Sequence, residues 1–345
     1  MAAADQRYLE LPPEEIYDIL CTEAASGLRA RANEAYVAAA ATLDGASSGG
    51  AELFAAYLDV TPVARAALDR MHEWLGRLND ERIAAARVAF RDATAIAEDA
   101  GPRLLEILYA HLDEPWAVLR LISAVMQRPG DRFVASTELA VFGERMLDNI
   151  DAQLKRVAAF DADRGREGGL ATGEAVRTAS LEIHEFNESM DLQPDGPWGS
   201  RLVRQRKTLV QAVEGRLKAV ESEVAAALPL QSSGNRRSGL HGQPRLTADP
   251  DPRQVQRAMA FLAFMVDVRS AGERLGFGAL WGRTTEQVQA RLDTYVEDLL
   301  EKLRAGEGDN LDRVRAYLDV AAEVMGALSD DRAAQIVRRR MAAAA

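Results

Sequence analysis

Cysteine is nearly absent from this sequence, and its scarcity excludes two common ways of stabilising a chain. Cys21 is the only cysteine among 345 residues. No disulfide can therefore form within the chain, and no zinc site can be built from cysteines. A chain without disulfides suits a reducing compartment, so we expect a cytoplasmic protein.

Long apolar runs are also missing. The most apolar stretch, Ala258 to Val266, is followed directly by Asp267 and is about half as long as a membrane-spanning helix. The first residues, MAAADQRYLELPPEE, lack the basic flank and the apolar core of a secretory signal peptide. We therefore expect no integral membrane segment and no signal peptide.

Positive charge is in short supply as well. The chain has 42 Lys and Arg residues against 53 Asp and Glu residues, so its formal net charge at pH 7 is −11. An acidic surface repels nucleic acids and anionic lipids at long range, and we expect no nucleic acid partner. Arginine far outnumbers lysine and alanine is abundant, a composition typical of GC-rich bacterial genomes.

No segment shows the alternating Val, Ile and Thr pattern of a β-strand. Apolar residues instead recur at three- and four-residue spacing from Pro13 to Arg340, which predicts amphipathic helices. Short connections between these helices favour antiparallel neighbours. We predict an all-α fold, either a multi-helical antiparallel bundle or a short irregular helical array, with no sheet.

Proline and serine mark several predicted helix starts. The pair Thr61-Pro62 predicts the start of a helix, separate from a short helix over residues 52–58. Ser200 predicts the start of a long helix. The apolar residues aligned along that helix are Leu202, Leu209, Val213, Leu217, Val220 and Val224.

Two segments without helical period predict the domain organisation. Residues 161–173 (DADRGREGGLATG) are rich in glycine and charge, and we interpret them as a linker between helical domains at 1–160 and 174–345. Residues 229–252 are rich in Ser, Gly and Pro. They predict a flexible segment that interrupts the second domain.

One acidic helix face holds the candidate catalytic residues Glu182, His184, Glu185 and Glu188. A zinc protease motif needs a second histidine one turn after the first, and Glu188 stands there instead. We expect no catalytic residue, no cofactor and no metal ion, and we interpret the face as solvated or partner-facing. An enzyme with an acidic site at these residues is the alternative.

Trp198 and the arginines that follow it, Arg201, Arg204 and Arg206, are the candidate partner-binding residues. Proline and glycine on both sides of Trp198 predict a constrained turn that presents a large ring at low entropic cost. The guanidinium groups beside it can pair with acidic groups of a partner. The rival interpretation is that the Trp198 ring folds inward and holds two helices together.

These patterns predict a non-catalytic protein–protein interaction protein of the bacterial cytoplasm, such as a scaffold, an adaptor or an assembly factor. There are two alternatives. One is the enzyme with an acidic site, and the other is a helical small-molecule-binding or regulatory domain with a pocket between helices. We expect a protein partner, and the sequence allows a homo-oligomer.

Overall fold

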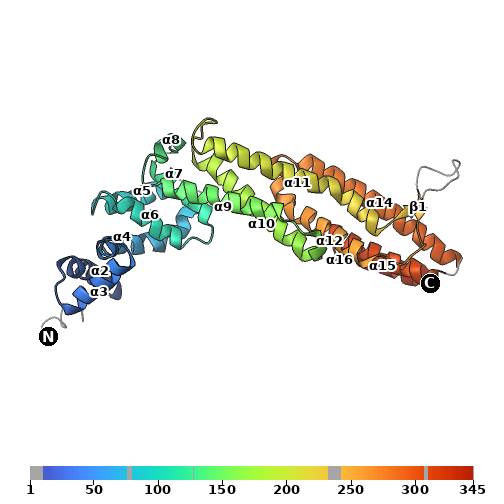
Figure 1. Cartoon of the computed structure of the whole chain (residues 1–345), viewed down its shortest axis with the longest axis horizontal. Helices are drawn as coiled ribbons and strands as arrows, with labels where there is room; N and C mark the ends of the chain where they lie inside the picture. The colour runs from blue at the N-terminus through green and yellow to red at the C-terminus, as the bar shows by residue number, and fades with distance from the viewer. Residues whose placement is uncertain (1–10, 76–79, 127, 232–241, 307–309, 345) are drawn as a thin grey trace. The chain divides into compact units, whose positions relative to one another are not determined.

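The computed structural model consists almost entirely of helices, so the all-α prediction is confirmed (Figure 1). The structure describes residues 11–75, 80–126, 128–231, 242–306 and 310–344. None of the described helices combines the length and the apolar character needed to span a bilayer.

The chain divides into two compact units. The first unit consists of residues 1–146 and 185–199, and the second of residues 147–184 and 200–345. The helices up to residue 134 are α2 (Pro13–Ala30), α3 (Glu34–Ala46), α4 (Gly50–Leu75), α5 (Asp80–Thr94), α6 (Ala100–Ala110), η2 (Pro115–Ala117), α7 (Val118–Met126) and α8 (Asp131–Val134).

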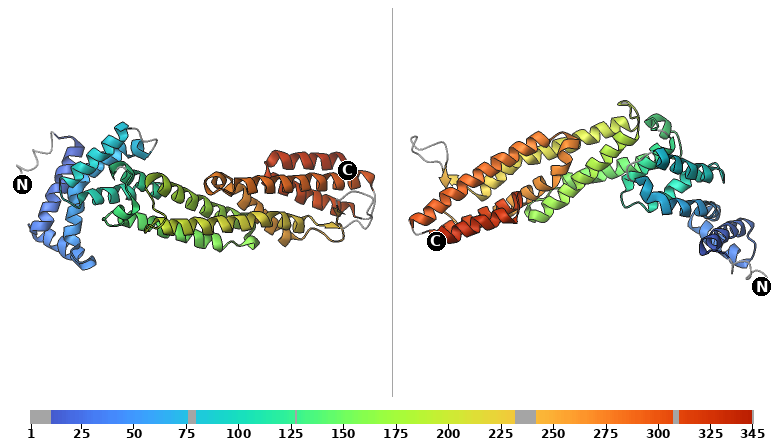
Figure 2. Two further views of the ribbon diagram at one scale, coloured as in Figure 1. Left: turned by 90° about the horizontal axis from the view of Figure 1, so that it is seen from above. Right: turned by 180° about the vertical axis from the view of Figure 1, so that it is seen from behind.

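The later helices are longer on average. They are α9 (Ala140–Ala158), η3 (Ala162–Arg164), α10 (Gly165–Ser189), α11 (Gly199–Ala227), α12 (Pro252–Asp267), η4 (Val268–Ala271), α13 (Gly272–Leu275), α14 (Gly278–Ala305), α15 (Leu311–Leu328) and α16 (Asp331–Ala344). In the second unit, α14, α15 and α16 lie side by side, and α12 packs against α15 (Figure 2).

The long helix α11 buries the apolar stripe that the sequence predicts. Every aligned residue of the stripe, from Leu202 to Val224, is at most 4% exposed. Residues at three- and four-residue spacing share one side of a helix, and this side of α11 forms part of the core.

The structure differs from the sequence-based expectation at Pro62. Pro62 lies inside α4, and residues 52–58 belong to the same helix. The hydroxyl of Thr61 donates to the carbonyl oxygen of Tyr57 at 2.9 Å instead of capping a new helix. A proline inside a helix costs about 3 kcal/mol, and the packing of α4 against α2, α3, α5 and α6 offsets this cost.

The structure also differs from the expected linker over residues 161–173. α10 begins at Gly165, well before the expected helix start at residue 174. A Cβ atom on Gly169 would lie 2.1 Å from the backbone oxygen of Ala260 in α12. The glycines that suggested a linker therefore include a position where two helices approach closely. The division of the chain into helical domains at 1–160 and 174–345 stays a prediction.

A short pair of strands stands where no sheet was expected. β1 (Leu230–Gln231) and β2 (Gln243–Pro244) pair antiparallel, with Leu230 opposite Pro244. They are the only strands in the part of the chain that the structure describes. The pair lies within residues 229–252, the segment predicted to be flexible.

The middle of that segment, residues 232–241, lies outside the described residues, and the prediction of flexibility is not tested there. Arg245, after β2, is described. Its backbone N–H donates to the carbonyl oxygen of Pro229 at 2.9 Å, so the described ends of the segment are joined by hydrogen bonds.

Candidate functional site

The acidic residues of α10 do not form one site, and Glu182 is the clearest case. Glu182 is fully buried, and its Oε1 accepts a hydrogen bond from the side-chain amide of Asn149 in α9. Its Oε2 has no hydrogen-bond partner among the described residues. Burial raises the pKa of Glu182 to about 7, and the hydrogen bond from Asn149 opposes this rise only in part.

Glu185 is also buried, but it belongs to an ion pair. The guanidinium of Arg120 in α7 donates to Oε2 of Glu185 at 2.6 Å and 2.9 Å. The hydroxyl of Ser189 donates to Oε1 at 2.6 Å. Since both oxygens accept hydrogen bonds, the carboxylate joins α7 to α10 and is not free to act as an acid or a base.

The other two acidic-face residues, His184 and Glu188, are exposed. Within the described ranges, no group of three or more His, Cys, Asp or Glu residues is arranged to hold a metal ion. The face is therefore split between buried and exposed positions. Acid–base or metal catalysis needs groups that converge on one point, and these four residues do not provide them.

Trp198 is part of the core of the first unit. The residue is 1% exposed, and its indole Nε1 donates to Oε1 of Glu144 at 2.7 Å. The ring meets Phe186 edge-on, with the ring centroids 6.0 Å apart. A Cβ atom on Gly143 would lie 2.4 Å from the indole ring. The inward interpretation holds, and the Trp198 ring is not exposed to a partner.

The turn before Trp198 is built around a buried aspartate that the sequence did not indicate. Asp131, the first residue of α8, is fully buried and accepts hydrogen bonds from the backbone N–H of Arg132 at 2.8 Å and of Gly199 at 3.3 Å. A Cβ atom on Gly196 would lie 2.0 Å from Oδ2 of Asp131. The carboxylate therefore caps the start of α11, and Gly196 leaves space for it.

The three arginines predicted to bind a partner have different surroundings. Arg201 donates to Asp148 at 2.6 Å and to Asp151 at 2.5 Å, so it links α11 to α9. Arg204 and Arg206 are exposed and make no ion pair within the part of the chain that is described. The predicted residues are therefore not one surface: the tryptophan is buried, one arginine is paired, and two arginines remain available.

Exposed apolar side chains gather near the start of the chain, and sequence reasoning missed them. Of the fourteen large apolar side chains that are exposed in the described part of the chain, six lie between residues 17 and 54. These six are Tyr17, Ile19, Leu20, Val37, Leu53 and Phe54. A concentration of exposed apolar groups is typical of an interaction surface.

On α2, Tyr17 and Leu20 belong to one apolar face. Ile16, Tyr17, Leu20 and Ala24 recur at three- and four-residue spacing and therefore share one side of the helix; we call these four residues the α2 apolar face. Tyr17 and Leu20 are each 49% exposed, and Ile16 and Ala24 are half-buried. The spacing is visible in the sequence, but a periodic stripe does not reveal whether the chain itself or a partner covers it.

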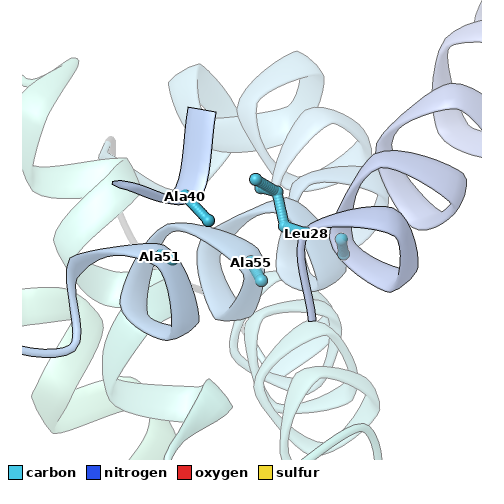
Figure 3. Packing of buried hydrophobic residues seen from close by; sticks show 5 residues of the cluster. Leu28, Ala40, Ala51 and Ala55 are labelled. Atoms are coloured by element: carbon cyan, nitrogen blue, oxygen red, sulfur yellow. The ribbon is translucent and has the colours of Figure 1, made fainter. Parts of the chain in front are cut away.

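The core beneath α2, α3 and α4 is made mostly of alanine (Figure 3). Its buried members are Ala25, Leu28, Ala40, Ala51 and Ala55. Alanine side chains bury little apolar area, and the hydrophobic contribution to folding scales with that area. This cluster therefore buries little apolar area, although Tyr36, Leu43 and Leu58 pack against it.

A cleft of about 770 Å³ lies in the second unit and is lined by residues of α10, α12, α15 and α16. Its rim carries charges of both signs, and several already have partners. Arg164 pairs with Glu167, and Arg338 lies 4.0 Å from Asp319. A rim whose charges offset one another does not favour a particular class of ligand.

No protein-family model, no curated protein and no solved structure matches this chain. The function must therefore be inferred from the chain's own residues.

Proposed function

We propose that this chain is a non-catalytic protein–protein interaction protein of the bacterial cytoplasm and that the α2 apolar face binds its partner. The main support is the distribution of side chains on the first helices, where alanines fill the core while Tyr17 and Leu20 stay half-exposed. Large apolar side chains in water do not stabilise the chain alone. A partner that covers them removes apolar area from water, which favours association.

Burial of these two side chains makes a favourable contribution to the free energy of binding. Fully burying a large apolar side chain contributes about 1.5–3 kcal/mol. Because half of each side chain is already buried, covering Tyr17 and Leu20 contributes about 1 kcal/mol each. Tyrosine is also enriched among the residues that dominate interfaces, and side chains at this spacing fit a helix or a groove of a partner.

The two alternatives have less support. An enzyme at the acidic face of α10 would need free, converging groups, whereas Glu185 is held by Arg120 and Ser189. A small-molecule-binding domain would need a mostly apolar pocket with a few converging polar groups. The charged cleft of the second unit lacks this character, and the apolar groove between α4 and α5, at about 360 Å³, is near the small end of the range for ligand pockets.

The variant Leu20→Glu tests the proposal. A charge within the α2 apolar face should abolish capture of the partner from a lysate of the native cell, measured by quantitative mass spectrometry, with helix content unchanged. Val203→Glu is the matched control, since Val203 is 59% exposed on α11. Arg204→Glu combined with Arg206→Glu tests the remaining basic residues separately. Equal capture by wild type and Leu20→Glu would show that the face is not the binding surface.

A further inference from the structure

A groove of about 360 Å³ lies between α4 and α5 in the first unit. Its walls are apolar and mostly small. Val63 and Ala66 come from α4, and Ala85, Val88 and Ala89 come from α5. Small side chains allow another helix to approach closely, because helices pack by fitting ridges of side chains into grooves.

The groove is a face that the rest of the first unit leaves open. Both α4 and α5 pack against α6 and α7, and α5 buries Ala86 and Ala93. Ala85, Val88 and Ala89 lie on a different side of α5, and Val88 is 44% exposed. The apolar wall of the groove is therefore available to a molecule from outside.

The two ends of the groove carry opposite charges. Arg70 lines it from the C-terminal half of α4, and Asp92 lines it from the C-terminal half of α5. Helices joined by a short connection run antiparallel, and α5 starts at residue 80 after α4 ends at residue 75. Arg70 and Asp92 therefore lie toward opposite ends.

These two charged side chains have only weak contacts within the chain. The guanidinium of Arg70 lies 3.5 Å from Glu73, and the carboxylate of Asp92 lies 3.9 Å from Arg91. All four side chains are at least 41% exposed, and exposed pairs of this kind contribute little. Both Arg70 and Asp92 can therefore form new ion pairs.

A second hydrogen-bond donor lies on the same helix as Arg70. Trp74 lines the groove and is 2% exposed. Its indole N–H has no acceptor in the described part of the chain, and leaving a buried donor unpaired is costly. The exposed guanidinium of Arg70 makes this end of the groove suitable for a carboxylate.

We propose that a second copy of this chain docks on the groove through the same face, related by a two-fold rotation. In such a contact each copy presents the same residues to the other. The rotation reverses the direction of the groove, so Arg70 of each copy faces Asp92 of the other. The apolar walls with Val88 meet in the middle, and two helix pairs form a four-helix contact. This surface is separate from the α2 apolar face and does not depend on the proposed function.

Sedimentation equilibrium of the full chain with charge-swapped variants tests this dimer. Wild type should dimerise at concentrations of about 10 μM. Arg70→Asp and Asp92→Arg should each raise the dimer Kd by about tenfold or more, because like charges then face each other. An equimolar mixture of the two variants should dimerise again, since both rim pairs then regain opposite charges.

Recovery in the mixture separates a specific contact from a folding defect, because a misfolded variant would not be rescued by another variant. Arg283→Asp makes the same charge change at an exposed arginine of α14 and should leave the Kd unchanged. A wild-type chain that stays monomeric at about 100 μM, or a mixture that does not dimerise, would overturn the proposal. A further result would also overturn the proposal: wild type stays monomeric and binds an apolar fluorescent dye, and Val88→Glu abolishes this binding. That result would assign the groove to a small molecule.

Discussion

At the scale of single residues, Glu182 places a carboxyl group in the core of the second unit, where one hydrogen bond from Asn149 replaces a shell of water. Its pKa is about 7 in the folded chain because burial disfavours the charged form, against an ordinary value of 4.5. Between these values the unfolded chain binds fewer protons than the folded chain. The contribution of Glu182 to the free energy of unfolding is therefore fully present below pH 4.5 and is lost as the pH rises toward 7.

Glu182→Gln should remove this pH dependence. Glutamine stays neutral at every pH, so the loss of about 2 kcal/mol expected in wild type between about pH 5.5 and about pH 7 should disappear. The variant should also be more stable than wild type above pH 7, where wild type must bury a charge or unfold. Urea unfolding at a series of pH values measures both effects.

Glu188→Gln is the control for this prediction, because Glu188 lies on the same helix and is exposed. The free energy of unfolding of Glu188→Gln should change with pH as that of wild type does. The free energy of unfolding of Glu182→Gln could instead fall with rising pH by the same amount as that of wild type. This result would show that other groups cause the pH dependence.

Single residues also show what the sequence could not reveal. A glutamate on an acidic helix face is expected to be exposed, and the burial of Glu182 depends on Asn149, which lies on another helix. The two interpretations of Trp198 could not be separated either. The choice depends on α9, where Gly143 leaves space for the ring and Glu144 accepts its N–H.

At the scale of helices, apolar periodicity was a more reliable signal than single prolines and glycines. The stripe of α11 predicts its burial because the 3.6-residue period follows directly from helix geometry. Pro62 and Gly169 each disfavour a helix when only the neighbouring sequence is considered. Tertiary packing overrides this local preference. In the fold, α4 is covered by neighbours on several sides, and Gly169 lies against the backbone of α12.

Two glycine-to-alanine variants separate a packing glycine from an ordinary one. Gly169→Ala should lower the free energy of unfolding by about 2 kcal/mol, since the added Cβ would lie 2.1 Å from the backbone oxygen of Ala260 and the helices must move apart. Gly215→Ala should raise it by about 0.5–1 kcal/mol, because alanine is the better helix former and the structure shows nothing within 4 Å of a Cβ there. Urea unfolding measures the free energy change of each variant. If Gly169→Ala changed stability by the same amount and in the same direction as Gly215→Ala, α10 and α12 would not be closely packed at this position.

At the scale of the whole molecule, the core beneath α2, α3 and α4 differs in composition from the core of the second unit. The core of α2, α3 and α4 in the first unit holds one buried leucine, Leu28, among alanines. In the second unit, Phe264, Leu292 and Leu300 are fully buried. Since stabilisation scales with buried apolar area, we expect the helices around Leu28 to unfold at a lower temperature than the second unit.

This difference predicts two thermal transitions, which core variants should assign. Leu28→Ala should lower only the first transition, and Leu292→Ala should lower only the second. Each substitution is expected to cost about 2–5 kcal/mol in its own part of the chain, from lost burial and the cavity left behind. Differential scanning calorimetry with circular dichroism can resolve the two steps. A single transition that both variants shift would mean that the chain unfolds as one cooperative whole, and it would contradict the predicted division into separately folding domains.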